Sequence, residues 1–367
     1  MQNKKLKYKR IIIKIGSNVL TTATSMLDTE RMNLLTEQIA RLFYAGIEII
    51  IVSSGAVAAG RGELSNHTPF RKLDAVSARQ LYSAVGQAKL INIYYHLFHN
   101  REIQCGQVLT TKESLSTRRQ YLNQKNCMET MLANHVIPIV NENDTTSITE
   151  LMFTDNDELS GMIATMMNAD ALVIMSNVNG IYNGNPTDKN AAIIKEIKSR
   201  KTDIAKYINT EKSNFGRGGM LTKARIARKV ADEGIEVIIA NGKTENILID
   251  LILNNFDVFC TRFVPATHFV SSVKKWIAHS DGFTKGAIYI NQGAYEALQQ
   301  PNAASLLPVG VERIEGSFEK NDIVQIISPK GEHIGIGRIN LSSEKAKQIM
   351  GKKGGKPFIH YDYMYLN

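Results

Sequence analysis

The sequence predicts an α/β fold, with a mainly parallel sheet sandwiched by helices and followed by a small β-rich domain. In the first part of the chain, short β-branched runs alternate with longer helical patterns, which is typical of such a sheet. After Pro265, short strand-like runs are separated by glycine, proline and Asp-Gly turn signals. With 367 residues, 43% of them hydrophobic, the chain is long enough for two domains. We place these at residues 1–265 and 276–357, joined by a linker at Phe263–Lys275.

The first domain is expected to contain strands, several of them apolar on both faces of the pleat, as a doubly buried sheet requires. These strands are Ile11–Ile15, Glu48–Val52, Gln104–Leu109, Val136–Val140, Ala171–Met175 and Glu236–Ala240. Between them we expect helices at Thr29–Ala45, Ser77–His99, Thr117–Asn134, Glu158–Asn168 and Thr222–Glu233. In the second domain, the runs GAIYI, DIVQII and HIGIGRI are the predicted strands.

The distribution of charge argues against a nucleic-acid-binding protein. The formal net charge is +9, but five of the basic residues lie in the first ten positions. From Ser271 onward, 12 basic and 9 acidic side chains give a net charge of only +3. This weak excess favours anionic ligands, but it is not the concentrated basic stripe of a nucleic-acid binder.

Cysteine usage and hydropathy indicate a cytoplasmic protein. Cys105, Cys127 and Cys260 are odd in number and have no C-x-x-C spacing, which argues against a disulfide framework and a cysteine zinc site. No apolar run approaches the ~18 residues needed to span a membrane. We therefore expect no membrane association.

Polar and glycine-rich residues follow four of the predicted strands. Lys14–Ser17 ends the first strand, Ser53–Gly60 follows the second, NEND ends the fourth and SNVNGIY the fifth. In an open α/β sheet, ligands bind at the carboxyl ends of the strands. Four such loops at one edge predict an anion-binding site.

Lys14 and the loop GRGGMLTK are the strongest candidates for that site. Lys14 stands among isoleucines, where a charge is costly without a partner, although an outward-facing lysine on an edge strand would also fit. In the loop, Gly218 and Gly219 offer backbone N–H groups to phosphate, while Thr222 and Lys223 open a helix. A loose glycine-rich linker is the alternative.

Acidic and amide residues cluster in VNENDTTSITELMFTDNDELSG, from Val140 to Gly161. Such a cluster could bind a metal, hold a substrate or be a solvated loop. The spacing lacks the D-x-D-x-D-G pattern with its distal glutamate, which argues against a calcium loop. His96 and His99, at i and i+3, have no third ligand nearby, so no protein metal site is assigned.

Common nucleotide and nucleophile motifs are absent from the sequence. The GKT at Gly242–Thr244 lacks the upstream glycine of a Walker A loop, because position 237 is Val237. GIGRIN lacks the third glycine of a dinucleotide fingerprint, and SSGAV is not a nucleophile elbow.

Several motifs together resemble the amino-acid kinase family in its glutamate 5-kinase branch. They are IIIKIGSNVL, IVSSGAVAAG, AVGQAKL, IVNENDTT, DNDELSG, GIYNGNP and RGGMLTKARIA, in order from Ile11 to about Ala240. The segment from KGAIYI to NDIVQI resembles the PUA domain that many bacterial members carry. The resemblance implies the amino-acid kinase fold and a C-terminal PUA domain.

The resemblance implies transfer of the γ-phosphate of ATP to the side-chain carboxylate of L-glutamate, the first step toward proline, with Mg²⁺ bridging the nucleotide phosphates. A carboxylate is already ionised at pH 7, so no catalytic base is required. Lys14 and Lys223 match the family's catalytic lysines, and Asp157 matches the residue that orients them.

The family's binding positions carry over residue by residue. Those for the substrate are Ser54, Gly55, Asp144 and Asn156, with Asp144 facing the ammonium group. Those for the nucleotide are Lys14, Ser176, Asn177, Arg217, Gly218, Gly219, Met220, Leu221, Thr222 and Lys223. The chain departs from the family at Asn177, where Asp is common, and at Leu221, where Ser is frequent.

Partners and rival functions follow from the same resemblance. It implies a homo-oligomer, either dimer or tetramer, and proline as a feedback inhibitor. RNA is a further candidate partner because of the PUA domain, but GRINLSS departs from the usual motif there. Rival functions are a same-fold kinase for acetylglutamate or aspartate and an RNA-binding protein with a vestigial kinase fold. Asp144 favours a substrate with a free ammonium.

Overall fold

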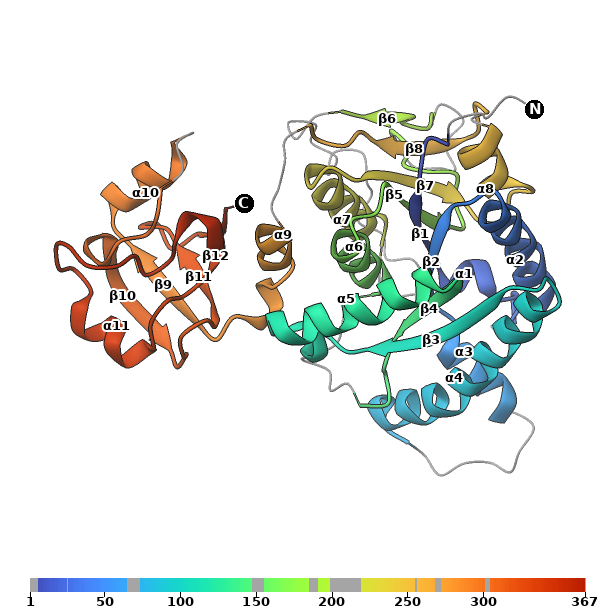
Figure 1. Ribbon diagram of the computed structural model, residues 1–367, viewed down its shortest axis with the longest axis horizontal. Coiled ribbons are helices and arrows are strands. Elements are labelled where there is room, and N and C mark those ends of the chain that lie inside the picture. Colours follow the sequence, from blue (N-terminus) through green and yellow to red (C-terminus); the bar gives the residue numbers. More distant parts are fainter. Residues whose placement is uncertain are drawn as a thin grey trace. The chain divides into compact units, whose positions relative to one another are not determined.

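The computed structural model divides the chain into two compact units, Met1–Phe269 and Val270–Asn367 (Figure 1). The structure describes residues 6–24, 26–64, 73–146, 155–184, 191–198, 219–254, 256–267, 272–300 and 304–366. In that part of the chain no helix is long and apolar enough to cross a bilayer.

The first unit is built on a mainly parallel sheet, as the sequence predicts. Among the described residues, its strand order is β3 (Gln104–Thr110), β4 (Val136–Glu142), β2 (Glu48–Ser53), β1 (Arg10–Ile15), β5 (Ala171–Ser176), β7 (Glu236–Asn241), β8 (Cys260–Phe263) and β6 (Glu196–Ile197). All six predicted strands are confirmed. Neighbours from β3 to β7 are parallel, whereas β8 is antiparallel to β7.

Strand β1 is central, which places Lys14 in the middle of the sheet. Lys14 is in register with Val52 on one side and with Ile174 on the other. An outward-facing lysine on an edge strand is therefore ruled out. Side chains alternate along β1, so Ile11, Ile13 and Ile15 enter one core while Lys14 points to the opposite face.

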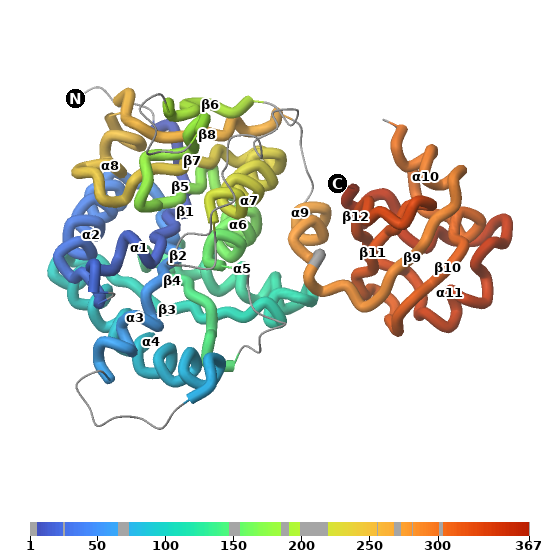
Figure 2. Tube along the Cα trace, turned by 180° about the vertical axis from the view of Figure 1, so that it is seen from behind, coloured from blue at the N-terminus to red at the C-terminus, as the bar shows by residue number. Residues whose placement is uncertain are grey.

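Helices cover both faces of the sheet (Figures 1 and 2). One layer contains α2 (Thr29–Tyr44), α4 (Ala75–His99) and the short α8 (Ile247–Ile249), and the other contains α5 (Arg118–Ala133), α6 (Asn156–Met166) and α7 (Met220–Asp232). All five predicted helices are confirmed, with ends that differ by a few residues. The short helix α1 (Ser17–Leu20) follows β1 directly.

The glycine-rich segment after β2 is a helix from Ala56 onward, so the predicted loop is wrong there. Helix α3 (Ala56–Leu64) packs closely against α4. A Cβ on Gly60 would lie 1.8 Å from the Tyr82 carbonyl oxygen, and one on Gly86 would lie 1.7 Å from that of Ala56. The glycines thus allow two backbones to approach closely, rather than making the chain loose.

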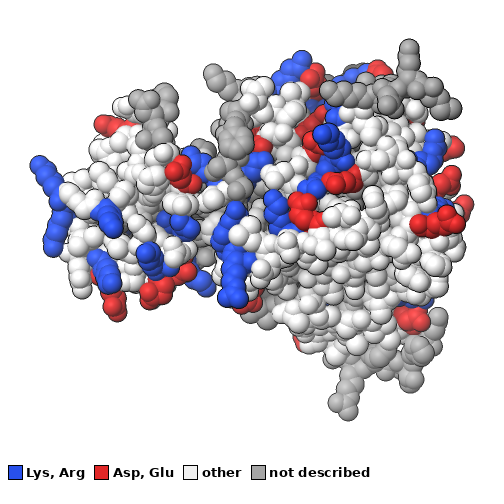
Figure 3. Space-filling view, viewed as in Figure 1, with Lys and Arg blue, Asp and Glu red and all other residues white. Residues whose placement is uncertain are grey.

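The second unit is a small β-rich domain, also as predicted. Its strand order is β10 (Val311–Gly316), β9 (Gly286–Ile290), β11 (Ile323–Ile327), β12 (His333–Arg338) and β13 (Met364–Leu366). Helices α9 (Ser272–Ala278), α10 (Gln292–Gln299) and α11 (Ser343–Ile349) accompany it, so the predicted linker overlaps β8 at one end and α9 at the other. On the face of this unit shown in Figure 3, acidic side chains lie among the basic ones.

We expect Gly86→Ala to lower the free energy of unfolding by about 1–3 kcal/mol, because the added methyl must push α3 and α4 apart. Urea unfolding of the purified chain measures this change. Gly184→Ala is the matched control in the same unit, since a Cβ there has no heavy atom within 4 Å. Equal stability of the two variants would contradict the close contact.

Candidate active site

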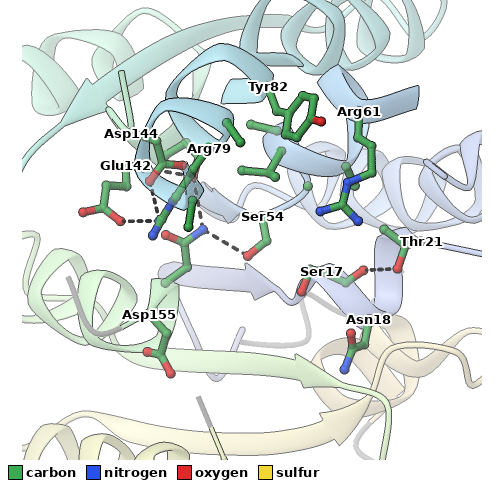
Figure 4. Close-up of a pocket in the computed structure, with 18 residues that line it drawn as sticks. Ser17, Asn18, Thr21, Ser54, Arg61, Arg79, Tyr82, Glu142, Asp144 and Asp155 are labelled. Atoms are coloured by element: carbon green, nitrogen blue, oxygen red, sulfur yellow. Dashed lines mark hydrogen bonds and ion pairs between the residues drawn. The ribbon is translucent and has the colours of Figure 1, made fainter. Parts of the chain in front are cut away.

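The carboxyl ends of β1, β2, β4 and β5 meet at one edge of the sheet, where a cavity of about 610 Å³ opens (Figure 4). Its lining comes from several elements that are distant in sequence. These residues are Ser17, Asn18, Thr21, Ser54, Gly55, Ala56, Val57, Ala58, Arg61, Ala75, Ala78, Arg79, Tyr82, Asn141, Glu142, Asp144, Asp155 and Asn156. The ends of β1, β2 and β4 thus bring residues of three predicted polar loops together at the cavity, whereas no lining residue comes from SNVNGIY after β5.

One carboxylate joins two lysines in this part of the sheet. Lys14 Nζ lies 2.6 Å from Asp157 Oδ1, and Lys223 Nζ lies 2.8 Å from Asp157 Oδ2. Asp157 has no solvent exposure and Lys14 only 4%, so both charges depend on this pairing. Asp157 stands in the first turn of α6, and Lys223 in the first turn of α7. The three residues that sequence analysis named as catalytic are therefore in direct contact.

The charges around Asp157 change two pKa values in opposite directions. Burial by itself would raise the pKa of Asp157, but the two lysines outweigh it and hold the pKa below its ordinary value. Burial, followed by repulsion from Asp157, raises the pKa of Asp155 to about 6. Asp155 caps α6 by accepting hydrogen bonds at Oδ1 from the N–H groups of Asp157 and Glu158. Its buried Oδ2 has no hydrogen-bond partner among the described residues.

Asn156 ties together the ends of two strands, β2 and β4. Its side-chain amide donates to the Ser53 carbonyl oxygen and to Ser54 Oγ, both at 3.0 Å, and to Asn141 Oδ1 at 3.1 Å. Gly55 follows Ser54 in the connection between β2 and α3. Its φ of +104° is a conformation that favours glycine. The predicted residues Ser54, Gly55 and Asn156 therefore lie together at the cavity.

Asp144 also lines the cavity, but it already has a cationic partner that sequence analysis missed. Arg79 Nη2 lies 2.5 Å from Asp144 Oδ1 and 3.5 Å from Glu142 Oε2. Ser83 donates a hydrogen bond to Asp144 Oδ2 at 3.3 Å. Arg79 and Ser83 belong to α4, far from Asp144 in sequence, and no local motif marks them.

The nucleotide-binding candidates lie beside the same lysines. Ser176 is buried at the end of β5, and its hydroxyl contacts Asn177 Oδ1 at 3.5 Å. Gly219 is the N-cap residue of α7, followed in the first turn by Met220, Leu221 and Thr222. The N–H groups of that turn point toward the helix start, where an anion binds favourably. Arg217 and Gly218 lie outside the described residues.

No group of three or more His, Cys, Asp or Glu side chains with the geometry of a metal site occurs in the described ranges. His96 and His99 are on the last turn of α4, where the His99 ring stacks on Tyr95.

We expect Asp155→Asn to raise the free energy of unfolding at pH 7.5 by about 1–3 kcal/mol. In the wild type the pKa of Asp155 is raised on folding to about 6, so stability falls as pH rises from about 4 through 6. Asparagine has no ionisable group, so it removes this loss of stability, and its side-chain oxygen still caps α6. Urea unfolding without nucleotide or metal should show the gain at pH 7.5 and none at pH 4; a gain equal at both would contradict it.

Comparisons with known proteins agree with this geometry. Residues 9–241 match the amino acid kinase family, and residues 286–357 match the PUA domain. The glutamate 5-kinase of Bacteroides thetaiotaomicron is 60% identical over 99% of both chains, and that of Chlorobaculum tepidum is 47% identical over 98% of both. A carbamate kinase from Giardia lamblia bound to AMP-PNP shares the fold, with a TM-score of 0.52 and 17% identity over 71% of this chain and 99% of its own. The chain belongs to the amino acid kinase family, in the group of the glutamate 5-kinases, and carries a PUA domain.

Proposed function

We propose that this protein transfers the γ-phosphate of ATP to the side-chain carboxylate of L-glutamate, giving L-glutamate 5-phosphate, the first step toward proline. One observation carries the proposal: Asp157 holds Lys14 and Lys223 on its two carboxylate oxygens beside the cavity. The names of the relatives, glutamate 5-kinase at up to 60% identity over nearly the full chain, support the same reaction.

Phosphoryl transfer to a carboxylate requires alignment and charge neutralisation rather than a base. The γ-carboxylate of glutamate is ionised at pH 7 and attacks phosphorus directly, while ADP leaves with the bridging oxygen. Lys14 and Lys223 approach this centre from β1 and α7, so their ammonium groups stabilise negative charge on the transferring phosphoryl group. Asp157, with its lowered pKa, stays ionised and keeps both lysines in place.

The cavity has groups for both ends of glutamate. Asp144 and the adjacent Glu142 suit the ammonium group, while Ser54 and Asn156, with the backbone N–H of Gly55, suit a carboxylate. A site of acids alone would repel a substrate with two carboxylates. Amide and hydroxyl donors among the acids allow the cavity to hold both signs of charge.

The nucleotide end of the site is formed by β5 and the start of α7. Ser176, Asn177 and the turn from Gly219 to Lys223 would contact ATP, with its phosphates at the N-terminus of α7. Mg²⁺ accompanies ATP and would neutralise its phosphates. The buried Asp155 Oδ2 is a carboxylate oxygen of the kind this ion prefers, and it lacks a hydrogen-bond partner in the described chain, so Asp155 would hold the ion from the protein side.

Acetylglutamate and aspartate are the rival substrates. An acetylated amine carries no charge, so it could not form the ion pair with Glu142 and Asp144 that a free ammonium group would form. Aspartate is shorter by one methylene, so its side-chain carboxylate would fall short of the lysines when its ammonium is bound. Inhibition by proline, assembly as a dimer or tetramer, RNA binding by the PUA domain and cytoplasmic location stay predictions from the family resemblance.

We expect Lys14→Met and Lys223→Met each to lower kcat by about 10²–10³-fold, with a much smaller effect on the KM for glutamate, because the lysines act on transition-state charge. An ATP-dependent hydroxamate assay, which traps the acyl phosphate, measures both constants. Lys89→Met is the control, since Lys89 pairs with Glu63 on an exposed surface. Unchanged kcat in both the Lys14 and Lys223 variants would contradict this mechanism. The same assay with acetylglutamate or aspartate in place of glutamate measures the choice of substrate.

We expect Asp144→Asn to raise the KM for glutamate by about 10-fold or more, because a charge-assisted hydrogen bond to the ammonium is lost. The KM for ATP should change by less than about twofold, since the nucleotide binds at the other end of the site. Steady-state kinetics with each substrate varied in turn measures both. An equal rise in the two KM values would refute a substrate role for Asp144.

A further inference from the structure

Arg79 enters the substrate end of the cavity from α4 and lies between two acids (Figure 4). Its guanidinium is 2.5 Å from Asp144 and 3.5 Å from Glu142, whose exposed fractions are only 7% and 3%. Two nearly buried carboxylates thus contact the same guanidinium. The substrate end of the cavity therefore holds charged groups of both signs in direct contact.

Arg79 is held in this position by the attachment of α4 to the end of β4. Gln80 donates to the Thr145 carbonyl oxygen at 3.3 Å, and Gln87 donates to the Glu142 carbonyl oxygen at 3.1 Å. Asp74 caps the start of α4 through the N–H groups of Val76 and Ser77. The backbone that carries Arg79 is thus fixed relative to both acids.

We propose that Arg79 binds the α-carboxylate of the amino-acid substrate while Asp144 and Glu142 bind its α-ammonium. The inference rests on the proposed function and deepens it. In an α-amino acid the two charged groups are attached to the same carbon, so the protein groups that bind them must be neighbours. Arg79 and Asp144 are such neighbours, of opposite charge. Substrate binding then exchanges one internal ion pair for two ion pairs with the zwitterion.

This exchange explains how the buried acids are tolerated without substrate and how the cavity selects its ligand. Without substrate, Arg79 contacts both acids and offsets part of the cost of burying their charge. A ligand with only one end of the zwitterion disrupts the contact between Arg79 and Asp144 and replaces it with one ion pair instead of two. Arg79 is in this view a specificity-determining residue, and it acts on the α-carbon end rather than on the phosphoryl group.

The test is calorimetric binding of L-glutamate and of its α-carboxamide, which keeps the ammonium and the γ-carboxylate. The wild type should bind L-glutamate about 10–100-fold more tightly, as expected for a charge-assisted bidentate contact. Arg79→Met should lose about that factor for L-glutamate and bind the two ligands equally. In kinetics, the KM for glutamate should rise with little change in the KM for ATP or in kcat.

Arg61→Met is the matched control, because Arg61 lines the same cavity but lies over the Tyr82 ring, 5.7 Å from its centroid. Whatever it does to overall affinity, it should keep the preference for L-glutamate over the α-carboxamide. Arg79→Met with an intact preference, or Arg61→Met with an equal loss of preference, would overturn the proposal.

Arg79→Lys provides the test if Arg79→Met fails to fold. Lysine keeps the charge but loses the planar fork, so the preference should fall to an intermediate value, and an unchanged preference would again refute the proposal.

The proposed reaction and the proposed role of Arg79 can fail separately. A wild type that binds glutamate with this preference but transfers no phosphate would refute only the proposed reaction. Phosphorylation of glutamate with an Arg79-independent preference would refute only the inference.

Discussion

The site depends on a single buried carboxylate, that of Asp157, shared by two lysines. Lys14 belongs to the central strand β1. Lys223 belongs to α7, which comes much later in the chain of the same unit. Neither ammonium could be buried beside the sheet without a counter-charge, and Asp157 could not be buried without both. The pairing therefore fixes α6 and α7 relative to β1, and it keeps two cations at the point where phosphate charge must be neutralised.

Many strands and helices of the first unit could be predicted from their hydrophobic pattern. Central strands such as β1 and β5 are continuous apolar runs with polar residues directly after them. Strands β6 and β8 were missed for physical reasons: β6 has two residues, and β8 contains Thr261 and Arg262. Helix α3 was missed because its glycines look like loop signals, although they serve a contact with α4 that only the folded chain shows.

The site was predictable where a motif is local and unpredictable where contacts are long-range. Lys14, Asp157 and Lys223 stand in recognisable segments, and the structure brings them together. Arg79 was missed, because its role arises from α4 lying across the end of β4, and Arg79 is 65 residues away from Asp144 in the chain. Arg79 and Asp144 are residue types that are common on protein surfaces, and only the folded chain brings their opposite charges into contact.

The distance along the chain between the lysines has a consequence for folding kinetics. A site whose charges come from β1, α6 and α7 has high contact order, since loop closure must precede any favourable contact among them. A collapsed intermediate with only the early strands would hold Lys14 without its counter-charge, and a nascent chain leaving the ribosome would meet the same condition until α6, which carries Asp157, emerged. Recovery of activity during refolding therefore reports the last tertiary contacts of the unit rather than its secondary structure.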